Sequence, residues 1–117
     1  MKFLIVDDSE AARFMLKSML ETLGHSVIGE AGTAEDAMAA YDKVKPEAVT
    51  LDLSLARGNG LEVLKGLRGK GATAQILVIS GNSQKRVQEE LAAQGASGFL
   101  CKPFNLEELA AALKGLR

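Results

Sequence analysis

Acidic, hydroxyl and lysine side chains follow short apolar runs of this chain, at the point where each run ends. They are Asp7 and Asp8 after residues 3–6, Asp52 after residues 48–51, Ser80 after residues 76–79, and Lys102 after residues 98–101. If the runs are parallel strands, these groups emerge at one edge of one sheet, where open α/β sheets bind ligands. Converging carboxylates repel each other unless one holds a proton or a cation lies between them. Because Mg²⁺ prefers oxygen ligands and binds through a few carboxylates plus phosphate, the pattern predicts a site for a divalent cation and a phosphoryl group.

The composition is that of a globular protein. Of 117 residues, 47% are hydrophobic and 25% are charged, so we expect residues 1–117 to form one domain. The net charge of −1 and the aromatic content of 4% argue against binding to nucleic acid or an anionic membrane.

No apolar run approaches the roughly 18 residues that span a bilayer, and the strand pattern begins too early for a signal peptide. The single cysteine agrees with a reducing compartment. We therefore expect a cytoplasmic monomer.

Five apolar segments are predicted as strands. They are residues 3–6, 26–31, 48–51, 76–79 and 98–101. The strands are short and barely alternate in polarity, which is typical of a parallel sheet covered by helices on both faces. Residues 26–31 form the weakest run and are predicted to be an edge strand. Consecutive strands are separated by enough chain for a helical crossover, which parallel pairing requires.

Helix signals fill the stretches between these strands. Apolar residues recur at helical spacing within residues 12–23, 37–44, 61–67, 87–92 and 106–116. Thr33 with Asp36, and Asn105 with Glu108, predict capping boxes at the second and fifth helices. The second helix must end before Pro46. The order βαβαβαβαβα predicts one doubly wound α/β domain with a parallel sheet.

Several side chains are assigned to ordinary structural positions. We expect Met15 and Met19 to fill the core under the first helix. Cys101 is expected to be a small buried hydrophobic residue, and His25 a solvated residue in a turn. Ser80 has an alternative role as the N-cap of the fourth helix.

Four sequence motifs, in order and each at the end of a predicted strand, resemble those of response-regulator receiver domains of the CheY type. They are Ile5-Val6-Asp7-Asp8-Ser9, Leu51-Asp52 with Gly60 eight residues on, Ile79-Ser80-Gly81, and Cys101-Lys102-Pro103-Phe104. The resemblance covers essentially the whole chain. It implies a flavodoxin-like sheet with strand order 2-1-3-4-5.

The resemblance implies a role for each acidic residue. Asp52 would be the phosphoryl acceptor, whose carboxylate attacks the phosphohistidine of a sensor histidine kinase or a phosphotransfer protein. Asp8 would bind Mg²⁺, or Mn²⁺, directly, with Asp7 close by or acting through water. The backbone carbonyl of Ser54 would be a further metal ligand.

The resemblance also assigns the phosphoryl contacts and the switch. Lys102 and Ser80 would contact the phosphoryl oxygens, with a backbone contact at Gly81. Ser80 would move toward the phosphoryl group and Phe99 would turn inward, which would change the face of the fourth helix, fifth strand and fifth helix for an unknown downstream protein. The bond before Pro103 would be cis.

The loop after Asp52 departs from the family pattern. Relatives usually carry proline where Ala56 stands and a bulky apolar residue where Gly58 stands, so we predict a loop that is mobile without metal. Ser54 and Asn82, at positions that tune hydrolysis of the aspartyl phosphate in the family, are small and uncharged.

Other functions remain open at this stage. The chain could pass its phosphoryl group to a histidine phosphotransfer protein, or be a receiver trimmed from a larger regulator. A haloacid-dehalogenase-type phosphatase also forms an aspartyl phosphate, but residues 7–10 lack the second Asp of its DxD motif. A flavodoxin-like FMN carrier needs a hydroxyl- and glycine-rich phosphate loop after the first strand, where Asp7 and Asp8 would repel the phosphate.

Overall fold

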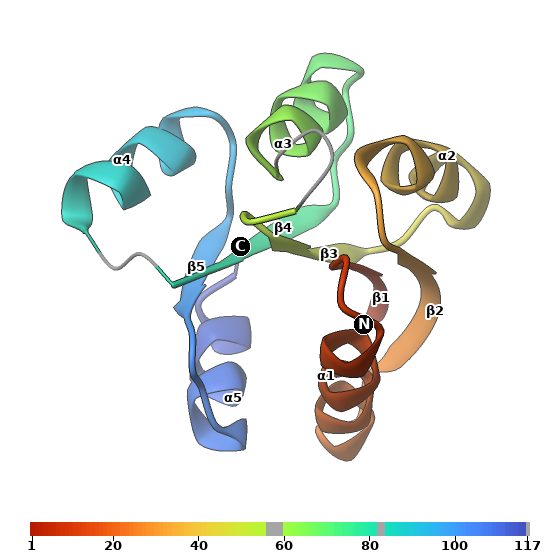
Figure 1. Ribbon diagram of the computed structural model, residues 1–117, viewed down its shortest axis with the longest axis vertical. Coiled ribbons are helices and arrows are strands. Elements are labelled where there is room, and N and C mark those ends of the chain that lie inside the picture. The colour runs from red at the N-terminus through yellow and green to blue at the C-terminus, as the bar shows by residue number, and fades with distance from the viewer. Residues whose placement is uncertain (56–59, 82–83, 117) are drawn as a thin grey trace.

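The centre of the computed structural model, which describes residues 1–55, 60–81 and 84–116, is a parallel β-sheet. In the described part of the chain the sheet has five strands in the order β2-β1-β3-β4-β5 (Figure 1). The strands are β1 (Lys2–Val6), β2 (Ser26–Ala31), β3 (Ala48–Asp52), β4 (Gln75–Ser80) and β5 (Gly98–Cys101). This confirms the predicted fold class and strand order. Ala56, Gly58 and Asn82 lie outside the described residues, so the mobile loop stays a prediction.

Helices cover both faces of the sheet. They are α1 (Glu10–Thr22), α2 (Ala34–Val44), α3 (Gly60–Gly69), α4 (Lys85–Ala93) and α5 (Leu106–Lys114). Figure 1 shows α1 and α5 on one face and α2, α3 and α4 on the other. None of the helices in the described ranges is long and apolar enough to cross a membrane.

Alternation along the strands divides the core into two layers. Successive side chains of a strand point to opposite faces. Leu4 and Val6 of β1 therefore pack into the cluster that includes Val63 and Leu67 of α3. Phe3 and Ile5 pack into the cluster with α1 and α5. All residues of the central strand β3 are buried, which explains why its sequence is almost continuously apolar.

Local capping sets the helix ends, as the sequence predicts. The Asn105 side chain accepts the Glu108 amide at 2.8 Å and the Glu108 carboxylate accepts the Asn105 amide at 3.0 Å, forming the expected capping box. At α2, only one half of the predicted capping box is found among the described residues: the Thr33 hydroxyl accepts the Asp36 amide at 3.0 Å, without the return bond from the Asp36 side chain. Lys45, with φ 49°, ends α2 immediately before proline.

The structure corrects the predictions for four side chains. Met15 is 64% exposed, because Leu16 and Leu20 take the core-facing positions of α1 and leave Met15 on the outer side. Met19 is partly buried against the core, as expected. Cys101 is half-buried. His25 is also half-buried, with its ring edge-on to Phe3 at 5.2 Å between centroids. Ser80 does not cap α4, because it ends β4 and Gln84 takes the N-cap position.

Candidate functional site

Three carboxylates that are distant in the sequence meet at the carboxyl edge of the sheet. β1 and β3 are neighbours in parallel register, with Val6 beside Leu51, so the residues that follow them emerge together. Asp7, Asp8 and Asp52 each place a carboxylate oxygen within 4.8 Å of the others. Asp7 is only 7% exposed and Asp52 only 3%, whereas Asp8 is exposed. The convergence predicted from the strand pattern is therefore present.

Asp7 is buried at the start of the turn into α1. Its Oδ1 accepts the Ser9 amide at 2.9 Å, and the Ser9 hydroxyl caps α1 by accepting the Ala12 amide at 3.1 Å. Burial raises the pKa of the Asp7 carboxyl, and the nearby charge of Asp52 raises it further, against the opposing effects of the Ser9 amide and Lys102. Ionised Asp7 is therefore electrostatically unfavourable in this site without a cation.

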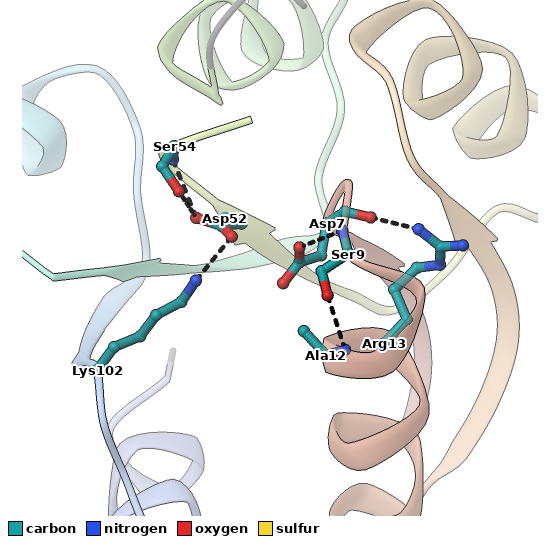
Figure 2. A network of polar contacts seen from close by, with 7 residues as sticks. All are labelled: Asp7, Ser9, Ala12, Arg13, Asp52, Ser54 and Lys102. Atoms are coloured by element: carbon teal, nitrogen blue, oxygen red, sulfur yellow. Dashed lines mark hydrogen bonds and ion pairs between the residues drawn. The ribbon is translucent and has the colours of Figure 1, made fainter. Parts of the chain in front are cut away.

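Both oxygens of Asp52 are held by hydrogen-bond donors. Oδ1 accepts the Ser54 amide at 2.9 Å and the Ser54 hydroxyl at 2.8 Å. Oδ2 accepts the Lys102 ammonium at 2.7 Å. Figure 2 shows Lys102 and Ser54 on the Asp52 carboxylate, with Asp7 beside it.

These donors decide the charge of Asp52. Burial alone would raise the pKa of this carboxyl, but the hydrogen bonds from Lys102 and Ser54, with the Lys102 charge, outweigh it. The pKa of Asp52 therefore lies below its ordinary value. At neutral pH the buried side chain is a carboxylate, which is the form that can act as a nucleophile.

The other predicted site residues lie at the same end of the sheet. Ser80 is the last residue of β4 and Gly81 follows it, exposed. The backbone carbonyl of Ser80 accepts the Lys102 amide at 2.9 Å. The Lys102–Pro103 bond is cis, as expected. Phe99 of β5 is partly buried against the core layer under α2, α3 and α4.

The donor set fits a small hard cation. Three carboxylate oxygens within 4.8 Å of one another form an all-oxygen cluster, and Mg²⁺ is typically bound by one or two carboxylates with waters and phosphate in the remaining positions. A cation there would also relieve the repulsion between Asp7 and Asp52 that raises the pKa of Asp7.

Gly60 of α3 has a steric reason for being glycine. Its amide donates to the Leu53 carbonyl at 3.2 Å. A Cβ at position 60 would lie 2.6 Å from the Asp52 carbonyl oxygen and 2.7 Å from the Leu53 Cα. The close approach of α3 to the end of β3 therefore depends on the missing side chain.

Sequence reasoning missed two contributions to this site. The Ser54 hydroxyl was not expected to contact Asp52, although a hydroxyl two residues after an acid is a common local partner. Arg13 of α1 donates from Nη1 to the Asp7 carbonyl oxygen at 2.6 Å. Its only sequence signal is its place one helical turn after the N-cap residue Ser9.

The fold and the acidic edge define a doubly wound α/β protein with its site at the switch point between β1 and β3. Residues 3–114 match the family described as response regulator receiver domain. The chain therefore belongs to the response-regulator receiver family, and it is CheY-like. Receiver domains are signalling phospho-acceptors.

Individual relatives support this membership. Chemotaxis protein CheY of Listeria monocytogenes is 33% identical over 97% of this chain and 96% of its own length, and CheY of Thermotoga maritima is 34% identical over 96% and 93%. The transcription regulator BvgA of Bordetella pertussis is 33% identical over 98% of this chain but only 55% of its own length. The structure of chemotaxis protein CheY4 of Vibrio cholerae has a TM-score of 0.90 at 30% identity, covering 99% of this chain and 98% of that one.

Asp7→Asn is expected to stabilise the metal-free protein at pH 7 by about 1 kcal/mol. The folded-state pKa of Asp7 is raised, so stability is lost as the pH rises from the ordinary carboxyl pKa to that raised value, and the loss is complete above it. The electrostatic difference between variant and wild type should therefore vanish below about pH 3, where the wild-type carboxyl is protonated in both folded and unfolded states. Urea unfolding across this pH range measures it, with Glu89→Gln on exposed α4 as the control. A less stable Asp7→Asn at pH 7 without metal would contradict the electrostatic argument.

Gly60→Ala is expected to destabilise the protein by about 1–3 kcal/mol, because the added Cβ meets backbone atoms that cannot rotate away. Gly69→Ala is the matched control in the same helix, where an added Cβ meets nothing within 4 Å. That control should lie within about 1 kcal/mol of wild type, on the stabilising side. Urea unfolding measures both, and equal stability of the two variants would refute the steric role of Gly60.

Proposed function

We propose that this protein is a magnesium-dependent phospho-acceptor, which takes a phosphoryl group on Asp52 from the phosphohistidine of a sensor histidine kinase or phosphotransfer protein. The observation that carries the proposal is a buried carboxylate held by Lys102 and Ser54, adjacent to two further acids, in a receiver-family chain. A structural acid would need only a neutralising partner. Asp52 instead lies at the carboxyl edge of the sheet, beside the two further acids of the cluster.

The chemistry requires a carboxylate in a fixed position. An oxygen of Asp52 forms the new bond to phosphorus as the bond from phosphorus to the imidazole nitrogen breaks, and the electron pair of that bond stays on the imidazole. The lowered pKa of Asp52 keeps it ionised. Hydrogen bonds to both oxygens restrict the carboxylate to one orientation, and phosphoryl transfer depends mainly on such positioning and on charge stabilisation.

The other site residues at the carboxyl edge of the sheet would neutralise the negative charge of the phosphoryl group. Asp7, Asp8 and Asp52, with the carbonyl of Ser54, would hold Mg²⁺ or Mn²⁺, and the bound ion neutralises charge on the phosphoryl oxygens. Lys102 is 38% exposed at its side chain and can turn from Oδ2 of Asp52 to a phosphoryl oxygen.

The Ser80 hydroxyl and the Gly81 amide are assigned further phosphoryl contacts. This assignment is supported by their position: Ser80 ends β4 and Gly81 follows it, at the edge where Asp52 ends the neighbouring strand β3.

The proposed output is a change on the surface formed by α4, β5 and α5, which would control a downstream protein partner. Ser80 pairs in register with Cys101, and Phe99 pairs with Val78, so a shift of Ser80 acts on the strand that carries Phe99. Movement of Ser80 toward the phosphoryl group would leave space into which Phe99 turns. Because Phe99 has no hydroxyl, burial alone would stabilise its inward position.

Incubation with acetyl phosphate and Mg²⁺ is expected to add one phosphoryl group to the wild-type protein, detected by intact-mass analysis. Asp52→Asn should remain unmodified, because the amide is not a nucleophile under these conditions. Asp42→Asn, which removes an exposed acid of α2, is the matched control and should be modified like wild type. Equal modification of Asp52→Asn, or modification that persists when the metal is chelated, would overturn the proposal.

Addition of beryllofluoride with Mg²⁺ is expected to shift the backbone amide resonances of residues 84–108, because the phosphoryl mimic draws Ser80 toward it and alters β5. Phe99→Ala should reduce these shifts while leaving those around Asp52 in place. Residues 26–31 of the edge strand β2 are the internal control and should move little. Shifts confined to the immediate surroundings of Asp52 would exclude the proposed output surface.

A further inference from the structure

The peptide that joins Asp7 to Asp8 is held through its carbonyl oxygen by the side chain of Arg13. The Asp7 amide donates to the Ala31 carbonyl at 3.0 Å, and the Asp7 carbonyl accepts Arg13 Nη1 at 2.6 Å. Together with the bond from the Ser9 amide to the Asp7 carboxylate, these contacts fix the backbone on both sides of the acidic pair. Figure 2 shows Arg13 reaching the Asp7 backbone from the side away from Asp52.

The arginine is itself fixed by a second acceptor. Its Nε donates to the Glu30 carboxylate of β2 at 3.2 Å. The Arg13 side chain is 18% exposed and the Glu30 side chain 38%, so the pair is open to water on the Glu30 side and its contribution is to orient the guanidinium. The planar guanidinium can serve two acceptors in different directions at once, so Arg13 links the edge strand β2 to the turn that carries the acids.

The surrounding backbone leaves room for this link. A Cβ at Gly32, immediately after β2, would lie 3.2 Å from Arg13 Nη1 and 3.8 Å from the Asp7 carbonyl oxygen. A side chain at position 32 would therefore crowd the hydrogen bond. The missing side chain at Gly32, the ion pair with Glu30 and the short bond to the Asp7 carbonyl therefore all favour the same position of the Arg13 guanidinium.

We propose that Arg13 is a positioning residue for the magnesium site: by holding the Asp7–Asp8 peptide it sets the direction of both carboxylates toward Asp52. This inference rests on the proposed function, since it assigns a role toward the proposed ion. Rotation of that peptide would move both acids together, so one hydrogen bond to its carbonyl controls two ligands. Removing a group that orients a metal ligand without touching the metal commonly lowers metal affinity by roughly ten- to a hundredfold.

Coulomb's law predicts the opposite effect of the same substitution. Removing a positive charge near a site for a dication should strengthen Mg²⁺ binding. Loss of a positioning contact should weaken it. The direction of the change in Mg²⁺ affinity therefore separates the two roles of Arg13.

The test is the dissociation constant for Mg²⁺, measured by titration calorimetry on the full chain. Arg13→Met keeps the apolar stem, loses all the donors, and is expected to bind Mg²⁺ about tenfold more weakly. Lys17→Met removes the same charge one helical turn further along α1 and is expected to match wild type or bind slightly more tightly. Carbonyl and amide resonances of the Asp7–Asp8 peptide should shift in Arg13→Met but not in Lys17→Met.

Gly32→Ala is the second variant, which keeps Arg13 and only crowds its bond, and it decides the question if Arg13→Met does not fold. The loss of Mg²⁺ affinity in Gly32→Ala should be smaller than the loss expected for Arg13→Met. Wild-type affinity in folded Arg13→Met, or in Gly32→Ala if the former is unfolded, would overturn the positioning role while leaving the proposed function intact. Failure of the wild type itself to bind Mg²⁺ would instead refute the magnesium dependence.

Discussion

The ion pair between Lys102 and Asp52 is the interaction on which the site depends. Asp52 is almost fully buried and lies next to a second buried acid, and an isolated carboxylate in such surroundings would take up a proton. The ammonium at 2.7 Å, with the two Ser54 donors, keeps Asp52 ionised. Asp7 shows the opposite response: among the described residues its carboxylate accepts the Ser9 amide and no ammonium hydrogen bond, and its pKa is raised. One buried carboxylate is thus held in its ionised form, while ionisation of the other is unfavourable without a cation.

The rest of the fold serves to bring this pair and its neighbours together. Lys102 follows β5 and Asp52 ends β3, so the pair spans β4, whose last residue Ser80 accepts the Lys102 amide. On the other side, β1 carries Asp7 and Asp8 to the same edge. Gly60 lets α3 approach the end of β3 closely, and Arg13 links β2 to the backbone of Asp7. The site is therefore a property of the sheet edge as a whole.

Much of the fold can be predicted from the sequence because the signals are local. The continuous apolar runs of the inner strands follow from burial on both faces, and the capping box of Asn105 and Glu108 is a contact between residues three apart. Met15 shows where such reasoning fails. Its spacing fits an apolar face of α1. How much of that face the sheet covers is decided by the way α1 lies on β1 and β2, and Met15 falls outside the covered part.

The sequence by itself determined the five strands, the residue types at their ends and hence the prediction of a cation and phosphoryl site, because strand and helix periodicity depend on neighbouring residues. Only the tertiary structure decided that Lys102 reaches Oδ2 of Asp52, and that Arg13 holds the Asp7 carbonyl. Hydrogen bonds of this kind depend on distances of a few tenths of an ångström between separate elements. Those distances are set by the packing of the helices on the sheet, which the linear order of residues does not specify.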